Sequence, residues 1–311
     1  MTEPVSPFTY PSATQTVLAQ RARIIKAIRC FFDNAGFLEV ETPIRIPAPI
    51  PEAHIDIQTS DGWALQPSPE LCMKRLLAAG HKKIYQICRC FRKGERGRRH
   101  VPEMTLLEWY AAGYTYLDLM AQCEDLIGFM AEKMGLGDQL VFQGHTVNLT
   151  PPWDRLTVDA AFQQFSGMSA EAALDQDCFD EEMGLVIEPR LGLQRPVFLY
   201  DYPIRCGSLA RASRKSPGVA ERFELYMAGM ELCNAFSELV DPVEQRHRFE
   251  AANQIREASG KPVFPLPERF LADLAHMPEA AGNALGLDRL VMLLCNAPSI
   301  DDVIAFFPES L

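Results

Sequence analysis

One segment, residues 84–110, constrains the fold of this chain more than any other. Residues 84–91 alternate apolar and polar side chains as a half-buried strand does, and residues 104–110 do so more loosely. The sequence therefore predicts two strands joined by a loop that contains two glycines. That loop holds most of the local positive charge: Arg92, Lys93, Arg96, Arg98, Arg99 and His100.

The charge of this loop is opposite to that of the chain, whose net charge is -11. Guanidinium groups fixed on a hairpin suit the polyphosphate of a nucleotide, because each can donate two parallel hydrogen bonds. A solvated basic turn is the simpler interpretation for such a loop taken alone. The remaining motifs decide between the two.

Bulk composition excludes several classes of protein. Among the 311 residues, 48% are hydrophobic and 23% charged, which is ordinary for a soluble enzyme. No run approaches the roughly 18 apolar residues of a membrane span, and residues 1–13 read as a flexible arm without a signal peptide. Nine scattered cysteines do not form a disulfide framework and favour the cytoplasm. The acidic balance argues against broad nucleic-acid binding, which depends on Lys and Arg.

Periodicity and punctuation predict the other elements. Helices are expected over residues 15–35, 71–79, 116–134, 242–259 and 285–294. Strands are expected over residues 37–43, 223–226 and 231–238, with a hairpin of 55–57 and 63–65 that turns at Asp61-Gly62. Residues 137–220 are less regular and read as an insertion.

Three constellations occur in order along the chain. They are a long helix followed by a strand ending at Pro43, the basic hairpin with Phe91-Arg92, and a glycine-containing strand that runs through Gly286 into a helix with Arg289. Together they resemble motifs 1, 2 and 3 of class II aminoacyl-tRNA synthetases. The resemblance implies an α+β catalytic core with a mainly antiparallel six- to seven-stranded sheet, flanking helices and dimerisation through the motif 1 helix.

Within that class, the chain resembles the lysyl branch. Ser68-Pro69-Glu70 with residues 73–76, and residues 222–224 with 231–238, are similar to its amino-acid and metal motifs. Motif 1 begins near residue 15, which leaves no room for an anticodon-binding barrel, and Ser68 and Ala284 replace the usual alanine and glycine. These features are similar to the elongation factor P (R)-β-lysine ligase family, whose members attach β-lysine to a protein lysine.

The resemblance implies an ATP- and Mg²⁺-dependent ligase that acts on lysine or β-lysine, with elongation factor P as the acceptor. Arg92 and Arg289 are the expected catalytic residues, and Glu224 and Glu231 the expected magnesium ligands. The expected ATP contacts are Arg92, Lys93, Gly94, Glu95, His100, Val101, Met104, Glu231, Leu232, Gly286 and Arg289. The expected substrate contacts are Ser68, Pro69, Glu70, Tyr110, Asn234, Glu238 and Ala284.

Some of these residues also have a simpler interpretation. The resemblance implies that Glu238 and Tyr110 recognise the distal ammonium of the substrate. Glu238 could instead be an ordinary residue on the surface of a strand, and Tyr110 could instead be a core residue. The hairpin tip also departs from the family pattern, because Gly94 stands at the usual glutamate, Val101 at an asparagine and Met104 at a phenylalanine. In residues 234–236, Ala235 replaces a glycine. Glu95 can replace the missing glutamate only if the loop shifts.

Two other functions remain open at this point. One is an adenylate-forming ligase for another small amino acid or acceptor. The other is a weakly active regulatory paralogue that binds lysyl ligands. The sequence does not choose between α- and β-lysine beyond Ser68 and Ala284, and no general base for the transfer step is evident.

Overall fold

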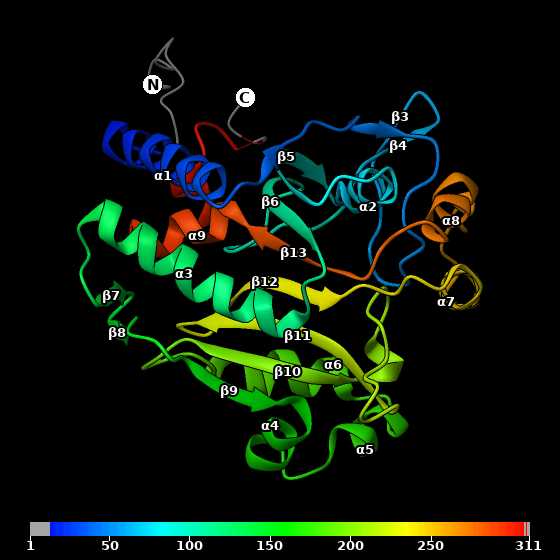
Figure 1. Cartoon of the computed structure of the whole chain (residues 1–311). Coiled ribbons are helices and arrows are strands. Elements are labelled where there is room, and N and C mark those ends of the chain that lie inside the picture. The colour runs from blue at the N-terminus through cyan, green and yellow to red at the C-terminus, as the bar shows by residue number, and fades with distance from the viewer. Residues whose placement is uncertain (1–12, 308, 310–311) are drawn as a thin grey trace, which may run out of the picture.

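A computed structural model describes residues 13–307 and 309, and a large mixed β-sheet organises it (Figure 1). The strands lie in the order β1 (Leu38–Glu39), β5 (Lys83–Phe91), β6 (Glu103–Ala112), β13 (Ala280–Gly286), β12 (Met230–Ser237), β11 (Val219–Met227), β10 (Val197–Pro203) and β9 (Asp154–Thr157). The pairs β1–β5 and β10–β9 are parallel, and all the others are antiparallel. The expected α+β class is confirmed. The sheet has 8 strands instead of six or seven, because short strands extend both edges.

Helices cover the sheet in three groups (Figure 1). The first group is α1 (Gln15–Asn34), α3 (Tyr116–Met134) and α9 (Leu287–Leu294). The second is α2 (Glu70–Ala78), α7 (Pro242–Ala258) and α8 (Glu268–Leu274). The third is α4 (Val158–Phe165), α5 (Ala170–Asp175) and α6 (Phe179–Glu182), followed by a π-helical turn, Met183–Ile187. Short 3₁₀ turns span Glu188–Arg190, Ile204–Cys206 and Ile300–Val303.

Two small sheets complete the fold. One contains β2 (Arg45–Ile46), β4 (Trp63–Leu65) and β3 (Thr59–Ser60), and the other is the hairpin of β7 (Gln139–Phe142) and β8 (His145–Asn148). The expected turn at Asp61-Gly62 is confirmed, since both residues have a positive φ, 51° and 78°. The expected strand at 55–57 is wrong: those residues are irregular, and the hairpin begins at Thr59 instead.

The two faces of strand β6 lie in different surroundings, one in the hydrophobic core and one at a cavity. Leu107, Trp109 and Ala111 belong to the main hydrophobic core, which the sheet forms with α1, α3 and α9. The indole of Trp109 donates to Gln122 on α3 at 2.8 Å, so even the polar atom on this face is paired. The alternate residues Glu108 and Tyr110 lie on the opposite face. One strand thereby contributes both to the core and to a cavity.

The start of α2 differs slightly from the expected helix, 71–79. The helix begins at Glu70, with Pro69 as its cap residue, and the Ser68 hydroxyl accepts from the Glu70 amide at 3.0 Å. Ser68 therefore stabilises the first turn, although from one position further out than an ordinary cap.

Residues 137–220 contribute more than a peripheral insertion. They supply β9 and β10 of the large sheet, and their helices pack around Phe162, Phe179 and Ile187 as a separate core. The expected arm at 1–13 lies outside the described residues except for Ala13, which is buried and donates to the carbonyl of Ile304 at 3.2 Å. No described helix is both long enough and apolar enough to cross a membrane.

Candidate active site

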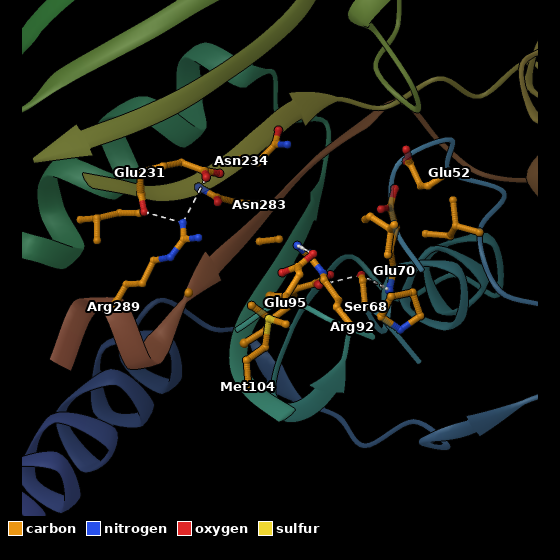
Figure 2. Close-up of a pocket in the computed structure, with 18 of the residues that line it drawn as sticks. Glu52, Ser68, Glu70, Arg92, Glu95, Met104, Glu231, Asn234, Asn283 and Arg289 are labelled. Carbon is orange, nitrogen blue, oxygen red and sulfur yellow. Dashed lines mark hydrogen bonds and ion pairs between the residues drawn. The ribbon is translucent and has the colours of Figure 1, made fainter. Parts of the chain in front are cut away.

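A cavity of about 320 Å³ lies on the face of the sheet opposite α3 (Figure 2). Alternate residues of three central strands form its floor: Met104, Leu106, Glu108 and Tyr110 of β6, Gly282, Ala284 and Gly286 of β13, and Leu232, Asn234 and Phe236 of β12. The start of α2, the β5–β6 loop and the start of α9 form its walls. The basic hairpin and the glycine-containing strand with its helix therefore converge on one cavity, whereas no described residue of α1 or of the segment up to Pro43 lines it.

One end of the cavity carries guanidinium groups. Arg92 lies 28% exposed in its side chain, and its Nε is buried without a hydrogen-bond partner among the described residues. Its nearest carboxylate, that of Glu95, is 3.8 Å from Nη1. A buried guanidinium nitrogen without an acceptor is costly. An anionic ligand such as a phosphate removes that cost.

Arg289, at the start of α9, is held in position by three neighbours, the first of which is the carbonyl of Arg99, 3.3 Å from its Nε. Its Nη1 donates to the carboxylate and to the backbone carbonyl of Glu231, at 3.1 and 2.9 Å, and its Nη2 contacts His100 Nε2. Burial, and after it the charge of Arg289, lower the pKa of His100 to about 4. His100 is therefore neutral at pH 7 and acts as an acceptor for Arg289.

The β5–β6 loop reaches the cavity despite its altered tip. Gly94 has a φ of +80°, which a residue with a side chain adopts rarely, and the next residue, Glu95, lines the cavity. The backbone amide of Lys93 donates to the carbonyl of Asp56 at 2.7 Å, which fixes the base of the loop. Val101 and Met104 also line the cavity. Glu95 therefore reaches the cavity, as a replacement for the missing glutamate requires.

The other end of the cavity is rich in carboxylates. The fully buried Lys74 ammonium lies 2.5 Å from Glu70 Oε1 and also contacts Glu238 Oε2. Burial alone would lower the pKa of Lys74, but the carboxylates of Glu238 and Glu70 outweigh it and raise the pKa. Glu238 Oε1 is buried without a hydrogen-bond donor among the described residues. The site therefore has acceptor capacity that Lys74 does not use.

Glu108 is a third carboxylate at this end, and the motif analysis did not assign it a role. It is fully buried and accepts from the Ser68 hydroxyl at 2.7 Å and from the Tyr110 hydroxyl at 2.9 Å. Burial, and after it the negative charge of Glu70, raise the pKa of Glu108 to about 7. Three carboxylates and one ammonium make this end suited to a ligand with more than one positive charge.

A glycine makes room for these groups. A Cβ at Gly282 would stand 2.2 Å from Tyr110 Cε1 and 2.4 Å from Glu238 Oε1. The register places Gly282 opposite Tyr110 and Phe236, between β6 and β12. Tyr110 and Glu238 therefore approach each other over a position that only glycine can occupy.

The two expected metal ligands lie in different surroundings. Glu231 lines the cavity, and although burial alone would raise its pKa, the charge of Arg289 lowers it, so the carboxylate is ionised. Glu224 does not line the cavity: it accepts from Tyr202 at 2.6 Å and from Tyr226 at 2.7 Å, and it pairs with Arg222 at 2.6 Å. A third carboxylate, Glu188, accepts from Tyr226 at 3.2 Å.

These carboxylates do not enclose a Mg²⁺ ion, but they can supply the one or two protein ligands that it usually takes. The described residues contain no group of three acidic, histidine or cysteine side chains placed to enclose a metal. Mg²⁺ usually binds through one or two carboxylates and completes its shell with water and phosphate oxygens. Glu231, with Glu224 behind it, matches that mode of binding.

Most of the sequence-predicted residues meet at this cavity. Ser68, Glu70, Arg92, Glu95, His100, Val101, Met104, Tyr110, Glu231, Leu232, Asn234, Ala284, Gly286 and Arg289 line it. Pro69, Lys93, Gly94, Glu224 and Glu238 do not. The sequence analysis missed Glu52 and Glu108 as parts of the site, and it placed Lys74 and Arg222 within motifs without giving either a role. Period-two spacing from Tyr110 would have placed Glu108 on the same face, whereas nothing local indicates Glu52.

Comparison with known proteins agrees with this geometry. Residues 9–310 match the family model described as tRNA synthetases class II (D, K and N). The chain belongs to the class II tRNA synthetase family. The resemblance to elongation factor P (R)-β-lysine ligases is also confirmed: the ligase of Edwardsiella ictaluri is 41% identical, over 95% of this chain and 96% of that protein.

Two other relatives show the range of the family. The elongation factor P--(R)-beta-lysine ligase of Pectobacterium carotovorum is 42% identical, over 96% of this chain and 97% of that protein. The lysine--tRNA ligase of Moorella thermoacetica is 40% identical over 93% of this chain, but the match covers 64% of that protein. Identity alone therefore does not separate the two kinds of relative.

Proposed function

We propose that this protein uses ATP and Mg²⁺ to activate (R)-β-lysine, or lysine, and transfers the acyl group to a lysine side chain of elongation factor P. The observation that carries the proposal is the division of charge along one cavity, with Arg92 and Arg289 at one end and Glu70 and Glu108 at the other. The buried Glu238 lies next to the acidic end, against the lining residue Gly282. A substrate that carries two ammonium groups and a carboxylate spans these two ends.

The residues at the basic end support the activation step. The substrate carboxylate attacks the α-phosphorus of ATP, and pyrophosphate leaves. Negative charge grows on the phosphoryl oxygens, so preorganised cations lower the barrier. The unpaired Nε of Arg92 is available for such an oxygen, and Arg289 is aligned by Glu231 and His100 before ligand binds.

Mg²⁺ when bound neutralises phosphate charge and fixes the geometry of the phosphates. Glu231, which lines the cavity, would be one ligand of the ion. Glu224, on the neighbouring strand β11, would be the second carboxylate. Hydrogen bonds from Tyr202 and Tyr226 keep the Glu224 carboxylate in place.

The residues at the acidic end support selection of a diamine. Glu70 lies at the start of α2, next to Ser68, and is placed for the amino group near the reacting carboxylate. Glu108, Tyr110 and Glu238 lie deeper and are placed for the distal ammonium. A monoamine would leave one of these carboxylates buried without a cation, which costs several kcal/mol. Lys74 compensates part of that charge in the absence of substrate.

The relatives favour protein modification over tRNA charging. The match covers 96% of the Edwardsiella ligase and 64% of the Moorella tRNA ligase. We also include in the proposal that the protein acts on a protein acceptor without anticodon recognition, as a homodimer, in the cytoplasm and without membrane association. Activation of lysine for a tRNA acceptor is the second candidate, because the identity to the tRNA ligase is 40%.

Two measurements test the proposal. ATP–pyrophosphate exchange with β-lysine, α-lysine and aspartate should show exchange with one of the diamines and none with aspartate. Exchange with none of them would indicate a regulatory paralogue. Intact-mass analysis of elongation factor P after incubation with enzyme, ATP and β-lysine should then show one added β-lysyl group. Acylation of tRNA with no change in elongation factor P would select the second candidate.

A further inference from the structure

Glu52 is a carboxylate at the rim of the cavity to which neither the motifs nor the activation step gives a role. It lines the cavity and is partly exposed, whereas Glu70, Glu238 and Glu108 are 9%, 1% and 0% exposed. In Figure 2 it lies beyond Glu70, on the side away from Arg289 and Glu231. The carboxylates therefore form a series from the deep diamine site to solvent, and Glu52 is the outermost.

The backbone around Glu52 is held firmly although it has no regular structure. The guanidinium of Arg256, 1% exposed, donates to the carbonyls of Glu52 at 3.0 Å and Ile55 at 2.9 Å. It also pairs with Asp56 at 3.0 Å and lies over the ring of Phe264. These contacts fix residues 52–56 against α7, so the position of Glu52 is defined before any ligand binds.

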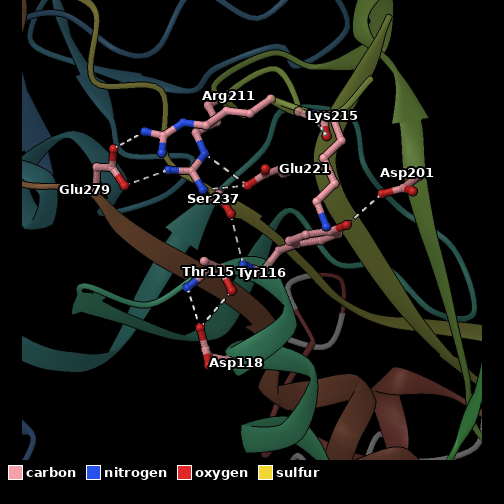
Figure 3. A network of polar contacts seen from close by, with 11 residues as sticks. Thr115, Tyr116, Asp118, Asp201, Arg211, Lys215, Glu221, Ser237 and Glu279 are labelled. Carbon is pink, nitrogen blue, oxygen red and sulfur yellow. Dashed lines mark hydrogen bonds and ion pairs between the residues drawn. The ribbon is translucent and has the colours of Figure 1, made fainter. Parts of the chain in front are cut away.

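The carboxylate itself is oriented from the opposite wall. The Ser208 hydroxyl donates to Glu52 Oε1 at 2.7 Å, and Ser208 is the one side-chain donor to this carboxylate among the described residues. The loop that carries Ser208 continues to Arg211, which pairs with Glu221 at 2.8 Å and Glu279 at 3.2 Å (Figure 3). Glu52 Oε2 has no such partner within the described part of the chain and is available to a ligand.

The charges that face Glu52 come from three elements. Burial raises its pKa, the Ser208 hydrogen bond lowers it, and the charge of Glu70 on α2 raises it again. The guanidinium groups of Arg222 on β11 and Arg92 after β5 lower it by smaller amounts. The net rise makes Glu52 a stronger base than a carboxylate in water.

We propose that Glu52 acts in the second half-reaction, the transfer of the acyl group to the acceptor lysine. There it binds the primary ammonium of that lysine and removes its proton. This role rests on the proposed function, because it requires an acyl-adenylate and an amine acceptor. It names the base for which the motifs offered no candidate. The position fits, since the rim lies next to Glu70, which is placed beside the reacting carboxylate, and is open to a side chain that enters from solvent.

The step balances without any further reactant. The acceptor ammonium transfers a proton to Glu52 Oε2, and the free amine nitrogen attacks the acyl carbon of the adenylate. The C–N bond forms, the bond between the acyl carbon and the phosphate oxygen breaks, and AMP leaves with the electron pair. The proton that the attacking nitrogen still loses passes to solvent or to the phosphate, and Glu52 returns its own proton to solvent.

A base is needed here because of the acceptor's chemistry. A lysine amine has a pKa of about 10.4, so at pH 7 less than about one molecule in a thousand is unprotonated. A positioned general base contributes roughly 10²- to 10⁴-fold. Hydroxylamine does not need this help, since it is already unprotonated at neutral pH. The two nucleophiles therefore separate loss of the base from loss of the adenylate.

The test measures both half-reactions in Glu52→Gln, with the exposed α7 residue Glu257→Gln as a matched control. At pH 7 transfer of β-lysine to elongation factor P should fall about 100-fold or more in Glu52→Gln. Exchange of pyrophosphate and formation of β-lysyl hydroxamate should stay within about twofold of wild type, in line with a base that acts only on the acceptor. The control should match wild type in all three assays.

The pH profile adds a readout that a structural role would not change. The deficit of Glu52→Gln should shrink as pH rises toward the pKa of the acceptor amine, because the amine then loses its proton unaided. Ser208→Ala should move the midpoint of the transfer profile to higher pH, because the carboxylate loses a hydrogen bond to its charged form.

Several outcomes would overturn the assignment. Normal transfer in Glu52→Gln, a deficit that is the same at every pH, or an unchanged midpoint in Ser208→Ala would each do so. A raised KM for β-lysine in the exchange assay would make Glu52 a ligand of the first substrate instead. If the proposed function itself is wrong, wild type will not modify elongation factor P, whether or not it forms the hydroxamate, and this result differs from a deficit confined to Glu52→Gln.

Discussion

At the scale of single residues, the site depends on buried charges that lack part of their complement. Arg92 has a buried Nε without an acceptor, and Glu238 has a buried Oε1 without a donor. In a folded core such groups are rare, since each costs about 1–3 kcal/mol. Arg92 lines one end of the cavity and Glu238 lies buried next to the other end, which fits a ligand that is negative at one end and positive at the other.

Arg92→Ala should abolish measurable substrate-dependent ATP–pyrophosphate exchange. The substitution removes a preorganised cation from the growing phosphoryl charge, which by analogy with a lost oxyanion donor costs about 3–4 kcal/mol, or roughly 10²- to 10³-fold. The fold should survive, because the side chain makes only a 3.8 Å contact with Glu95. Near-normal exchange by a well-folded variant would refute the role.

Glu108 should make the ligand-free protein less stable as pH rises. Its pKa is about 7 in the folded protein against an ordinary 4.5, so the folded state binds the proton more tightly. Stability contributed by this group is therefore present at low pH and is lost as pH rises between these values, at up to about 1.4 kcal/mol per pH unit. Thermal unfolding from about pH 5 to pH 8 measures the slope.

Glu108→Gln provides the matched comparison for that slope. Glu188, whose pKa is also raised to about 7, contributes in the same direction, so the wild-type slope alone is not specific. The difference between wild type and variant isolates Glu108. Identical slopes for the two proteins would show that Glu108 does not titrate in this range.

At the scale of elements, the central strands place functional groups through a strict alternation. In β13, Ala281 and Leu285 belong to the core, while Gly282, Ala284 and Gly286 face the cavity. Small residues on that face leave room for the side chains of β6 and β12. The function of this strand is therefore as much in the volume it leaves free as in the groups it carries.

Gly282→Ala should damage both stability and recognition of the diamine. A Cβ would stand 2.2 Å from Tyr110 and 2.4 Å from Glu238, so one of these side chains must move. Overpacking of this kind costs about 1–3 kcal/mol. We expect a lower melting temperature and a large rise in KM for β-lysine in the exchange assay.

Gly128→Ala is the control for that substitution. Gly128 lies within α3, and a Cβ there would meet nothing within 4 Å. Because alanine is the better helix former by about 1 kcal/mol, the control should be as stable as wild type or more so. Unchanged KM values in Gly282→Ala would show that the close approach at β13 does not position the recognition groups.

At the scale of the whole molecule, the first helix is tied directly to the catalytic end. Arg21 of α1 pairs with Asp288 at 2.6 Å and donates to Thr105 at 3.0 Å and to the carbonyl of Val303 at 3.2 Å. Asp288 in turn accepts from the amide of Thr105 at 2.7 Å. One network of hydrogen bonds and an ion pair therefore joins motif 1, the hairpin strand and the motif 3 helix.

The proposed homodimer through this region makes a prediction of its own. Leu38, directly after α1, is 52% exposed, and Ile44 nearby in sequence is 42% exposed. Sedimentation equilibrium should give the mass of a dimer, and Leu38→Asp should shift it toward monomer, because burying a carboxylate in an apolar contact is unfavourable. Leu185→Asp, which changes another exposed leucine, should remain dimeric. A monomeric wild-type protein would contradict the proposal.

Local pattern accounts for much of the architecture. The helix at 116–134 is observed with the same bounds, and the strands around Glu231 and Tyr110 form where periodicity indicated. Neither β9 nor β10 was predicted, since residues 137–220 were read only as an insertion; β9 has only four residues and pairs in parallel with β10. The strand expected at 55–57 did not form: the carbonyl of Ile55 accepts from Arg256 and that of Asp56 from the amide of Lys93, instead of from a neighbouring strand.

The amino-acid sequence was sufficient for the class II core and for most of the residues that line the cavity, since its motifs resemble those of a known family. It did not show which charges would meet. The pairing of Lys74 with both Glu70 and Glu238, the burial that raises the pKa of Glu108, and the fixing of Glu52 by Ser208 and Arg256 join segments distant in the chain. Burial and charge act through space, so only the tertiary structure decided how these carboxylates divide their roles.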